Sequence, residues 1–398
     1  MTVSSIQAAP FPPIPVTGAG MATALGGLVG GCAASRAGIM RISEILPPES
    51  SGEGVPGEAG ASGREEEQES LFSGHRVRDL PSHVSGMERL AQLGAGALED
   101  LFSAIQDPAR ELGRYALILC LPSGYLEWAR TNLSGGAPDA FSTGAFVDPR
   151  EDARLEEIKA ALIPRLFSLF PRLPRPAWTG LVLEDQAGFS EGVGRAAALL
   201  AQGRIESCLL GGMDSRVGWE ELTAMEEMGL LMTPEFSAGF IPGEAAAFLL
   251  LKAPGTPETP VALLAAAAQG AERNHRLSGD PPLGEALAGV ARSALSNAGA
   301  EGAPLFVSGT VNGSPWHSKE WGYLLYRTRA LNAATHWFPA ADFGEAGAAA
   351  GHLAACGVLR GFDRGYIDAG HAILLQSAEC GRKGAVLMRR PTSSGEGM

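Results

Sequence analysis

The chain alternates short apolar runs with longer segments in which apolar residues recur every three or four positions. Runs of this length are typical of buried strands, and the segments between them have the spacing of amphipathic helices. The alternation predicts an α/β protein in which helices connect the strands. The expected strands are Ala116–Leu121, Leu181–Leu183, Ile205–Leu210, Ala246–Leu251, Val261–Ala267, Leu305–Val307, Ala372–Leu375 and Ala385–Met388.

Two helices are predicted most clearly. The first has apolar residues at helical spacing from Val193 to Leu200, and Gly203 follows where a helix ends in a left-handed residue. The second has its apolar face between Leu283 and Leu295 and closes at residues 297–299. A predicted strand follows each helix, as expected for repeated α/β units.

A proline-rich linker, Ala253–Pro260, divides the chain into two α/β halves at residues 1–253 and 261–391. Proline removes a backbone donor and fixes φ, so neither a helix nor a central strand is expected to cross the linker. Within the first half, residues 47–74 are rich in Gly, Ser and Glu, a composition that predicts a mobile surface loop.

Composition excludes several kinds of partner. The chain has 398 residues, of which 45% are hydrophobic, enough for one large or two medium cores, and its formal net charge of -13 argues against nucleic-acid and anionic membrane partners. We find neither a signal-peptide pattern nor an apolar segment of membrane-spanning length, so a cytoplasmic protein is expected. Its 5 cysteines are scattered, which indicates neither a disulfide framework nor a metal site. No motif points to a cofactor.

Five segments are each a weak signal of a protein family, but their order and spacing together make a strong one. They are Val16–Gly26, Ala34–Ile39, Ala201–Ser215 with its Gly-Gly-Met-Asp turn, Gly239–Ala247 and Asn274–Asp280. In this order they resemble the β-ketoacyl-acyl-carrier-protein synthases over most of the chain. The resemblance implies a thiolase-like fold, a duplicated α-β-α-β-α arrangement of five layers with a mixed five-stranded sheet in each half. Such proteins pair through an edge strand of the first half, so a dimer is expected.

Three positions that carry chemistry in that family are altered here. When the sequences are aligned at Gly203, Gln186 stands at the position of the family's nucleophilic cysteine. Ser308 and Glu345 stand at the positions of its two catalytic histidines. A glutamine is no nucleophile at neutral pH, and a carboxylate at Glu345 repels an enolate, so we expect no catalytic residue for condensation or decarboxylation. Because residues 312–319 contain a one-residue insertion, His317 is an alternative to Ser308.

The resemblance also implies a group of residues around the former substrate pocket. The histidine of the entrance segment is His275, and Cys380 replaces the phenylalanine gate of the glycine loop at Gln376–Ala385. The family's lysine before the second histidine falls near Ala340 and is absent as well. The pocket residues expected from these matches are His275, Gly309, Thr310, Cys380 and Gly381.

Two functions remain open on these residues. One is a catalytically inactive binding or adaptor protein, similar to degenerate relatives that accompany secretion-effector systems. The other is a subunit similar to a chain-length factor, which forms a heterodimer with a ketosynthase in an acyl-chain synthase. The partners implied are a second copy, a ketosynthase-like subunit, an acyl carrier protein or a secretion effector.

A hydrolase is a third and disfavoured reading. Gly188–Gly192 matches the G-x-S-x-G elbow, which would make Ser190 a nucleophile with Asp342 and His371 in the chain order of an α/β-hydrolase. A pattern this short arises by chance in a glycine-rich chain, and thiolase-like folds have an elbow of their own at this turn.

Overall fold

A single large sheet organises the molecule. The computed structural model describes residues 6–45, 47, 72–103, 105, 107–134, 146–276 and 278–391. In these residues the sheet has 10 strands in the order β10-β9-β11-β12-β8-β1-β7-β6-β4-β5. They are β1 (Ile14–Thr23), β4 (Tyr115–Leu121), β5 (Trp178–Leu183), β6 (Ser207–Ser215), β7 (Glu244–Lys252), β8 (Ala262–Ala271), β9 (Leu305–Gly309), β10 (Thr335–Trp337), β11 (His371–Ser377) and β12 (Arg382–Arg389). A separate pair consists of β2 (Ser43–Ile45) and β3 (Phe72–Gly74).

The sheet contains the same arrangement twice. The order β1-β7-β6-β4-β5 and the order β8-β12-β11-β9-β10 each have two antiparallel pairs followed by two parallel pairs. Strands β1 and β8 also pair with each other, with Ile14–Val16 opposite Ala262–Leu264. Each half therefore has the predicted mixed five-stranded sheet, and this short antiparallel contact joins the two sheets along one edge.

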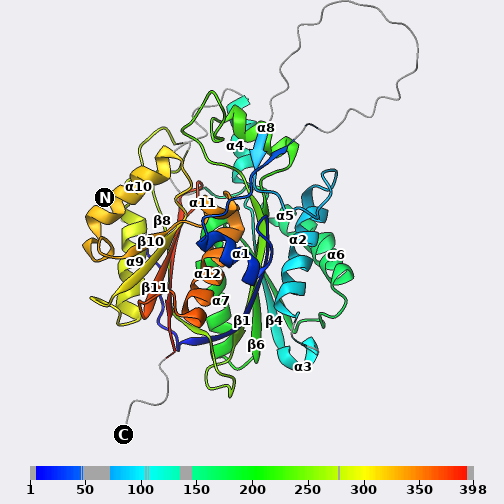
Figure 1. Cartoon of the computed structure of the whole chain (residues 1–398), viewed down its shortest axis with the longest axis vertical. Helices are drawn as coiled ribbons and strands as arrows, with labels where there is room; N and C mark the ends of the chain where they lie inside the picture. Colours follow the sequence, from blue (N-terminus) through cyan, green and yellow to red (C-terminus); the bar gives the residue numbers. More distant parts are fainter. Residues whose placement is uncertain are drawn as a thin grey trace, which may run out of the picture.

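The helices form three layers around the two halves of the sheet. Figure 1 shows α9 and α10 on one outer side, α7 and α12 between the halves, and α2 and α6 on the other outer side. This is the predicted five-layer thiolase-like architecture. The helices are α1 (Leu28–Arg36), α2 (Gly86–Leu101), α3 (Pro108–Leu112), α4 (Tyr125–Ser134), α5 (Glu151–Ala160), α6 (Leu162–Leu169), α7 (Gly188–Ala201), α8 (Trp219–Glu227), α9 (Glu285–Asn297), α10 (Pro315–Arg327), α11 (Ala340–Phe343) and α12 (Ala350–Arg364).

Strands β4 and β7 bury every one of their residues. A strand covered by helices on both faces needs apolar side chains on both, which explains why these segments are continuous apolar runs rather than alternating ones. Small residues in the central helices have a different role, because they let these helices approach the strands closely. A Cβ on Gly192 of α7 would lie 2.7 Å from Leu210 and 2.9 Å from the Cys120 sulfur, so glycine lets the helix approach β4 and β6 closely.

Each of the eight predicted strands overlaps an observed strand, and the two predicted helices are α7 and α9. Gly203 has φ +65° and Gly299 has φ +61°, which confirms the predicted helix ends. The predicted loop at 47–74 lies mostly outside the described residues. Its last three residues were predicted wrongly, because Phe72–Gly74 form β3, where Phe72 packs into a buried apolar cluster beside Val217 and Leu222.

The approach of β1 to α2 supports a first prediction. A Cβ on Gly20 would lie 2.3 Å from the backbone nitrogen of Leu101, so Gly20→Ala is expected to lower the free energy of unfolding by about 1–3 kcal/mol. Gly30→Ala in α1 is the matched control, since its nearest contact is 3.9 Å away and alanine favours a helix by about 0.5–1 kcal/mol. Urea unfolding followed by circular dichroism measures both variants. Equal stabilities would contradict the prediction.

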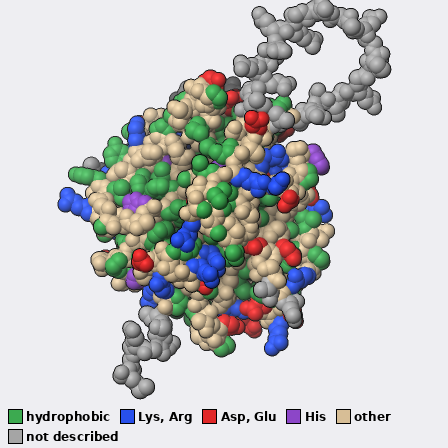
Figure 2. All heavy atoms as spheres, in the orientation of Figure 1, with side chains coloured by type: hydrophobic (Ala, Val, Ile, Leu, Met, Phe, Trp, Pro, Cys, Tyr) green, Lys and Arg blue, Asp and Glu red, His purple; other side chains and the backbone are tan. Residues whose placement is uncertain are grey.

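Figure 2 shows hydrophobic side chains scattered among charged groups over one face of the molecule. The exposed large apolar residues include Val29, Ile39, Met40 and Ile42, which belong to α1 and the segment after it. In the part of the chain that the structure describes, no helix has both the length and the apolar character needed to cross a membrane.

Candidate functional site

A short turn, Asp185–Ala187, connects β5 to α7 at the carboxyl end of the parallel strands. Asp185 has φ +47°, and no other described residue except glycine has positive φ. The strained backbone is held by the segment after β4, because the backbone nitrogen and hydroxyl of Ser123 donate to the Asp185 carboxylate at 2.8 and 2.5 Å. The turn thereby places Gln186, which is fully buried, at the start of the central helix.

The Gln186 amide binds two carboxylates of the second half. Its Nε2 donates to Glu379 Oε2 at 2.9 Å and to Glu345 Oε1 at 3.2 Å. Glu345 also accepts from the Gly347 backbone nitrogen at 2.8 Å and from Asn312 Nδ2 at 2.6 Å. The middle residue of the turn before α7 in one half is thus hydrogen-bonded to two loops of the other.

Arg216, just beyond β6, lies among the same carboxylates. Its guanidinium is 3.5 Å from Glu379, 3.9 Å from Glu345 and 3.7 Å from Asp214. Asp214 in turn accepts from the Ala348 backbone nitrogen at 3.0 Å. Arg216 and the carboxylates of Asp185, Asp214, Glu345 and Glu379 are all buried, and we call these five residues the Arg216 cluster.

Burial and charge act in opposite directions on the acids of the Arg216 cluster. Burial raises the pKa of Asp214 to about 7, although the positive charge of Arg216 opposes the shift. Burial also raises the pKa of Asp185. Burial would likewise raise the pKa of Glu379, but Arg216, His317 and the hydrogen bonds to its carboxylate, including that from Gln186, together outweigh burial and lower the pKa to about 2. One guanidinium therefore lies among four carboxylates, and the pKa is raised for Asp185 and Asp214 but lowered for Glu379.

The structure brings together two of the three residues that the sequence predicts at the family's catalytic positions. Gln186 and Glu345 are in contact, as described, whereas Ser308 lies buried on β9 and its hydroxyl has no hydrogen-bond partner among the described residues. The loop after β9 reaches the site instead. Asn312 contacts Glu345, and the Nδ1 atom of His317 lies 3.2 Å from Asn312 Oδ1.

The five expected pocket residues lie in two places, one with His275, Cys380 and Gly381 and the other with Gly309 and Thr310. His275 and Cys380 belong to one buried aromatic region, where Nδ1 of His275 is 2.9 Å from the Tyr125 hydroxyl and Cys380 packs in the apolar cluster of Tyr125. Thr310 accepts from the Ser377 backbone nitrogen at 2.9 Å, and a Cβ on Gly309 would lie 2.4 Å from Trp321. Gly381 has φ +92°, and its carbonyl accepts from Glu272.

Sequence reasoning missed most of the Arg216 cluster. Asp214 and Arg216 follow Gly211 and Gly212, and Glu379 lies in the loop Gln376–Ala385. Charged residues directly after buried strands were the available signal, since the carboxyl ends of parallel strands meet at one edge of a sheet. Their clustering around one guanidinium depends on contacts between the two halves and could not be read from spacing.

The hydrolase alternative is corrected by the positions of its three residues. Ser190 is buried in α7, donates to the Ala187 carbonyl at 2.9 Å and lies next to Gly384, which pairs with Gln376 near the carboxyl end of β11. His371 is the first residue of β11, about 16 Å away along a strand of this length. Asp342 binds the Ser35 hydroxyl and the Trp337 indole.

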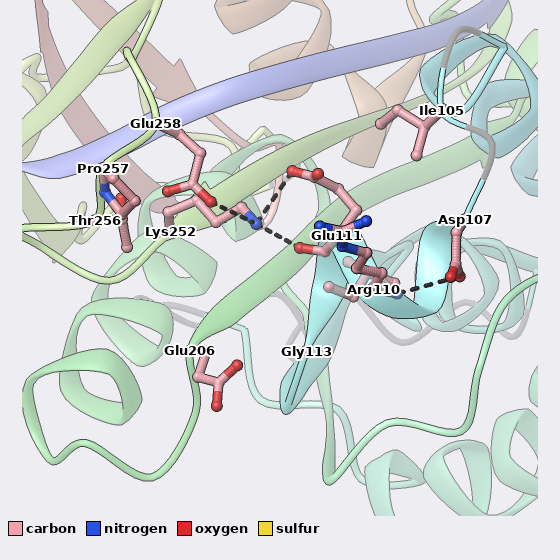
Figure 3. A pocket seen from close by; sticks show the side chains of 11 residues that line it. Ile105, Asp107, Arg110, Glu111, Gly113, Glu206, Lys252, Thr256, Pro257 and Glu258 are labelled. Atoms are coloured by element: carbon pink, nitrogen blue, oxygen red, sulfur yellow. Dashed lines mark hydrogen bonds and ion pairs between the residues drawn. The ribbon is translucent and has the colours of Figure 1, made fainter.

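A cavity of about 650 Å³ lies at the other end of the strands from Gln186, beside the start of β6 and the end of β7. Figure 3 shows Lys252 of this cavity pointing between Glu111 and Glu258. Its amine is 3.1 Å from Glu111 and 3.7 Å from Glu258, and it donates to the Glu111 carbonyl. Because the lysine is paired on each side, we interpret these contacts as joining α3 to the end of β7.

Neither the protein-family models nor the curated proteins compared with this chain match it. Solved structures do. The ishigamide ketosynthase/chain length factor has a TM-score of 0.70 at 18% identity, and a β-ketoacyl synthase from Burkholderia phymatum STM815 has 0.66 at 16%; each match covers 96% of this chain and 100% of the other. A type II polyketide acyl-carrier protein in complex with its ketosynthase has 0.70 at 15%, with the same coverage. At these identities the likeness concerns the fold, and this chain has the thiolase-like fold of ketosynthases and chain-length factors.

Proposed function

We propose that this chain is a catalytically inactive ketosynthase-like protein that acts by binding, as the non-catalytic subunit of a dimer with a ketosynthase-like partner. The observation that carries the proposal is the double hydrogen bond from Gln186 to Glu345 and Glu379. An amide nitrogen committed to two carboxylates cannot attack a thioester. The hydroxyl and the thiol near the start of α7 are both bound: Ser190 donates to the Ala187 carbonyl at 2.9 Å and Cys120 to the Gly188 carbonyl at 3.2 Å. Burial also raises the pKa of Cys120, which disfavours its thiolate.

The charge of the site also opposes the family's chemistry. Condensation and decarboxylation both develop negative charge on an enolate, which needs hydrogen-bond donors or positive charge aimed at it. Here Glu345 and Glu379 flank the Gln186 amide, and the single guanidinium of Arg216 is shared among the carboxylates of its cluster. An enolate formed at this position would be repelled.

The free edge of the sheet supports a paired subunit. β5 is the last strand of the first half and pairs with β4, and within the described residues no strand covers its other edge. An unpaired edge of this kind can accept a strand from a partner. The other terminal strand, β10, has three residues, whereas β5 has six and offers the longer edge. Two of the similar structures are titled as a ketosynthase with a chain length factor, which supports a ketosynthase-like partner over an unrelated one.

A second candidate is an adaptor without a ketosynthase partner, including one that serves a secretion-effector system. The extent of rebuilding favours it, because Glu379 and Cys380 have replaced the glycine and the aromatic gate of the loop and are packed into buried contacts of their own. A subunit that only shapes an acyl pocket would be expected to keep more of that loop.

Affinity capture from the native host with mass-spectrometric identification separates the two candidates. Recovery of a cysteine-bearing ketosynthase, with or without an acyl carrier protein, is expected from the proposal. Light scattering of the purified chain adds the homodimer as a distinct outcome. Recovery of other proteins alone would overturn the subunit role and leave the adaptor.

Inactivity is tested directly by giving the site a nucleophile. In Gln186→Cys the thiol would lie beside Glu345 and Glu379, whose negative charges disfavour the thiolate. We expect neither the natural chain nor this variant to gain mass when incubated with acyl and malonyl thioesters, measured by intact-protein mass spectrometry beside an active ketosynthase as control. Acylation of the natural chain would refute the proposed inactivity.

A further inference from the structure

A cavity of about 490 Å³ opens in the first half between α2, α4 and α8. Its walls include the apolar side chains of Leu90, Leu126 and Met225. Its buried lining residues include Asp185 and Asp214, two carboxylates of the Arg216 cluster. The cavity therefore combines an apolar body with an inner end that reaches buried acids.

One carboxylate oxygen at this inner end is open to a ligand. Asp214 is 3% exposed, and its Oδ2 accepts from the Ala348 backbone nitrogen at 3.0 Å. Its Oδ1 accepts no hydrogen bond within the described residues, and this oxygen is not fully enclosed, whereas Arg216 Nε is. Both oxygens of Asp185 are already bound by Ser123. Asp214 Oδ1 is therefore a buried acceptor without a protein donor.

Three arginines also line the cavity, but acids outside the lining already neutralise them. An arginine in an ion pair repels a second cation less than a free one does, because the charge of its partner lies close by. Arg216, which lies 3.7 Å from Asp214, has two such acids, and one of them is Glu345 at 3.9 Å. The shortest pairs are Arg89 with Glu244 at 2.5 Å, Arg154 with Asp148 at 3.2 Å, and Arg216 with Glu379 at 3.5 Å.

The acids of the lining are neutralised less completely. Glu127 is held in ion pairs with two arginines, at 2.7 and 2.5 Å. Glu220 and Glu221 are exposed at the mouth, and neither forms an ion pair within the part of the chain that the structure describes. Arg130, the remaining arginine of the lining, is exposed and likewise has no ion pair there. Two free acids at the mouth therefore face one free arginine, and Asp214 adds negative charge at the inner end.

Charge and shape together select the ligand. A carboxylate or phosphate would be repelled by Asp214 and by the two acids at the mouth. A neutral group gains nothing from these charges. A metal ion is not expected, because within the described residues no group of three or more His, Cys, Asp or Glu side chains could hold one. An ammonium group on an apolar chain donates to Asp214 Oδ1 in a charge-assisted hydrogen bond and places its chain against the apolar walls.

We infer that this cavity binds a small organic cation, a primary ammonium on an apolar body, whose N–H group donates to Asp214 Oδ1. The ammonium supplies positive charge that the Arg216 cluster lacks, since one guanidinium there lies among four buried carboxylates. Its other N–H groups are free to bind water toward the mouth. The inference stands apart from the proposed function, because it needs neither a partner subunit nor any particular state of Gln186.

Three probes of one shape test the inference. Hexylammonium, hexan-1-ol and hexanoate differ in the end group alone, and isothermal titration calorimetry of the full-length chain at pH 8 compares them. Hexylammonium is expected to bind about ten-fold or more tightly than hexan-1-ol, and hexanoate more weakly than both. Equal or stronger binding of hexan-1-ol would show an apolar site without charge selection, and stronger binding of hexanoate an anion site. Either result, or no binding of hexylammonium at millimolar concentration, overturns the inference.

Asp214 also predicts how binding depends on pH. Burial raises its pKa to about 7, with Asp185 and Glu345 acting in the same direction and Arg216 opposing them. Glu379, the fourth acid of the cluster, has a pKa of about 2 and stays ionised in this range. Hexylammonium keeps its charge while Asp214 gains a proton, so the affinity is expected to drop about ten-fold or more from pH 8 to pH 5.5. In Asp214→Asn the affinity should be lower at pH 8 and nearly independent of pH. The same pH dependence in the natural chain and the variant would contradict Asp214 as the acceptor.

A cavity-filling variant locates the binding. Ala224 on α8 lines the cavity, so Ala224→Phe is expected to remove hexylammonium binding while Asp214 stays in place. Ala160→Phe on the exposed side of α5 is the matched control and is expected to bind as the natural chain does. Equal affinity in the two variants would place the ligand elsewhere and contradict the assignment. Circular dichroism confirms the fold of each variant, and the pH comparison with Asp214→Asn tests the inference independently of Ala224→Phe.

Discussion

Arg216→Met is expected to lower the free energy of unfolding by about 3–5 kcal/mol, the largest effect we predict for a single substitution. The variant leaves Asp214, Glu345 and Glu379 buried without their cation, and removing one partner of a buried charge network uncovers the desolvation penalty of the others. Burial alone would lower the pKa of Arg216, yet Glu379 and Glu345 raise it above its usual value, so the guanidinium stays charged.

Two further variants distinguish charge from packing in this prediction. Adding Glu345→Gln and Glu379→Gln to Arg216→Met removes the uncompensated charges, so the triple variant is expected to recover part of the lost stability. Arg165→Met is the surface control, because Arg165 is 2.6 Å from Glu88 with both side chains well exposed, and such pairs contribute about 0–1 kcal/mol. Urea unfolding measures all of them. If Arg165→Met and Arg216→Met lose the same stability, the buried network has no special role.

The second large effect is a dependence of stability on pH through Asp214. The pKa of Asp214 is raised from 3.8 to about 7 in the folded protein, so between these values the folded state holds a proton that the unfolded chain has lost. Stability from this group is therefore present at low pH and declines as pH rises from about 4 to about 7. Asp185, whose pKa burial also raises, acts in the same direction.

Asp214→Asn is expected to remove this decline, because an amide keeps an acceptor for Ala348 without carrying a charge. Above pH 7 the variant should exceed the natural chain by up to about 4 kcal/mol, from about 1.4 kcal/mol for each unit of pKa shift. Thermal unfolding from pH 5 to pH 8 measures the difference. Asp363→Asn, at an exposed residue that pairs with Arg360, is the control. Parallel pH profiles for the natural chain and Asp214→Asn would contradict the assignment.

Glu379 gives the opposite dependence at lower pH. Its pKa is lowered from 4.5 to about 2, so its contribution to stability is present above pH 4.5 and is lost as pH falls toward 2. The two residues lie in one cluster, yet Asp214 makes the folded protein more stable as pH falls and Glu379 makes it less stable. Stability is therefore expected to be greatest in mildly acidic solution, where Asp214 is protonated and Glu379 is ionised.

Much of the site's outline was predictable, and most of its chemistry was not. Segment order predicts that the turn before α7 and the loop containing Glu345 belong to one site, and Gln186 and Glu345 are 3.2 Å apart. Ser308 was expected there as well, but Asn312 reaches Glu345 instead. The path of a loop after a strand depends on what it packs against, which spacing alone does not contain.

The sequence by itself determined eight strands of the large sheet and the helices α7 and α9, whereas β1 and β10 were not among the predicted strands. Runs such as β4 and β7 are buried on both faces and must be apolar throughout, and Gly203 marks a helix end that other residues adopt with strain. The tertiary structure alone decided the joining of the two halves through β1 and β8, and the gathering of Arg216 with its four carboxylates. Apolar periodicity is a local property of the chain, whereas the balance of buried charges arises between residues as distant as Gln186 and Glu379 and exists only once the halves have packed together.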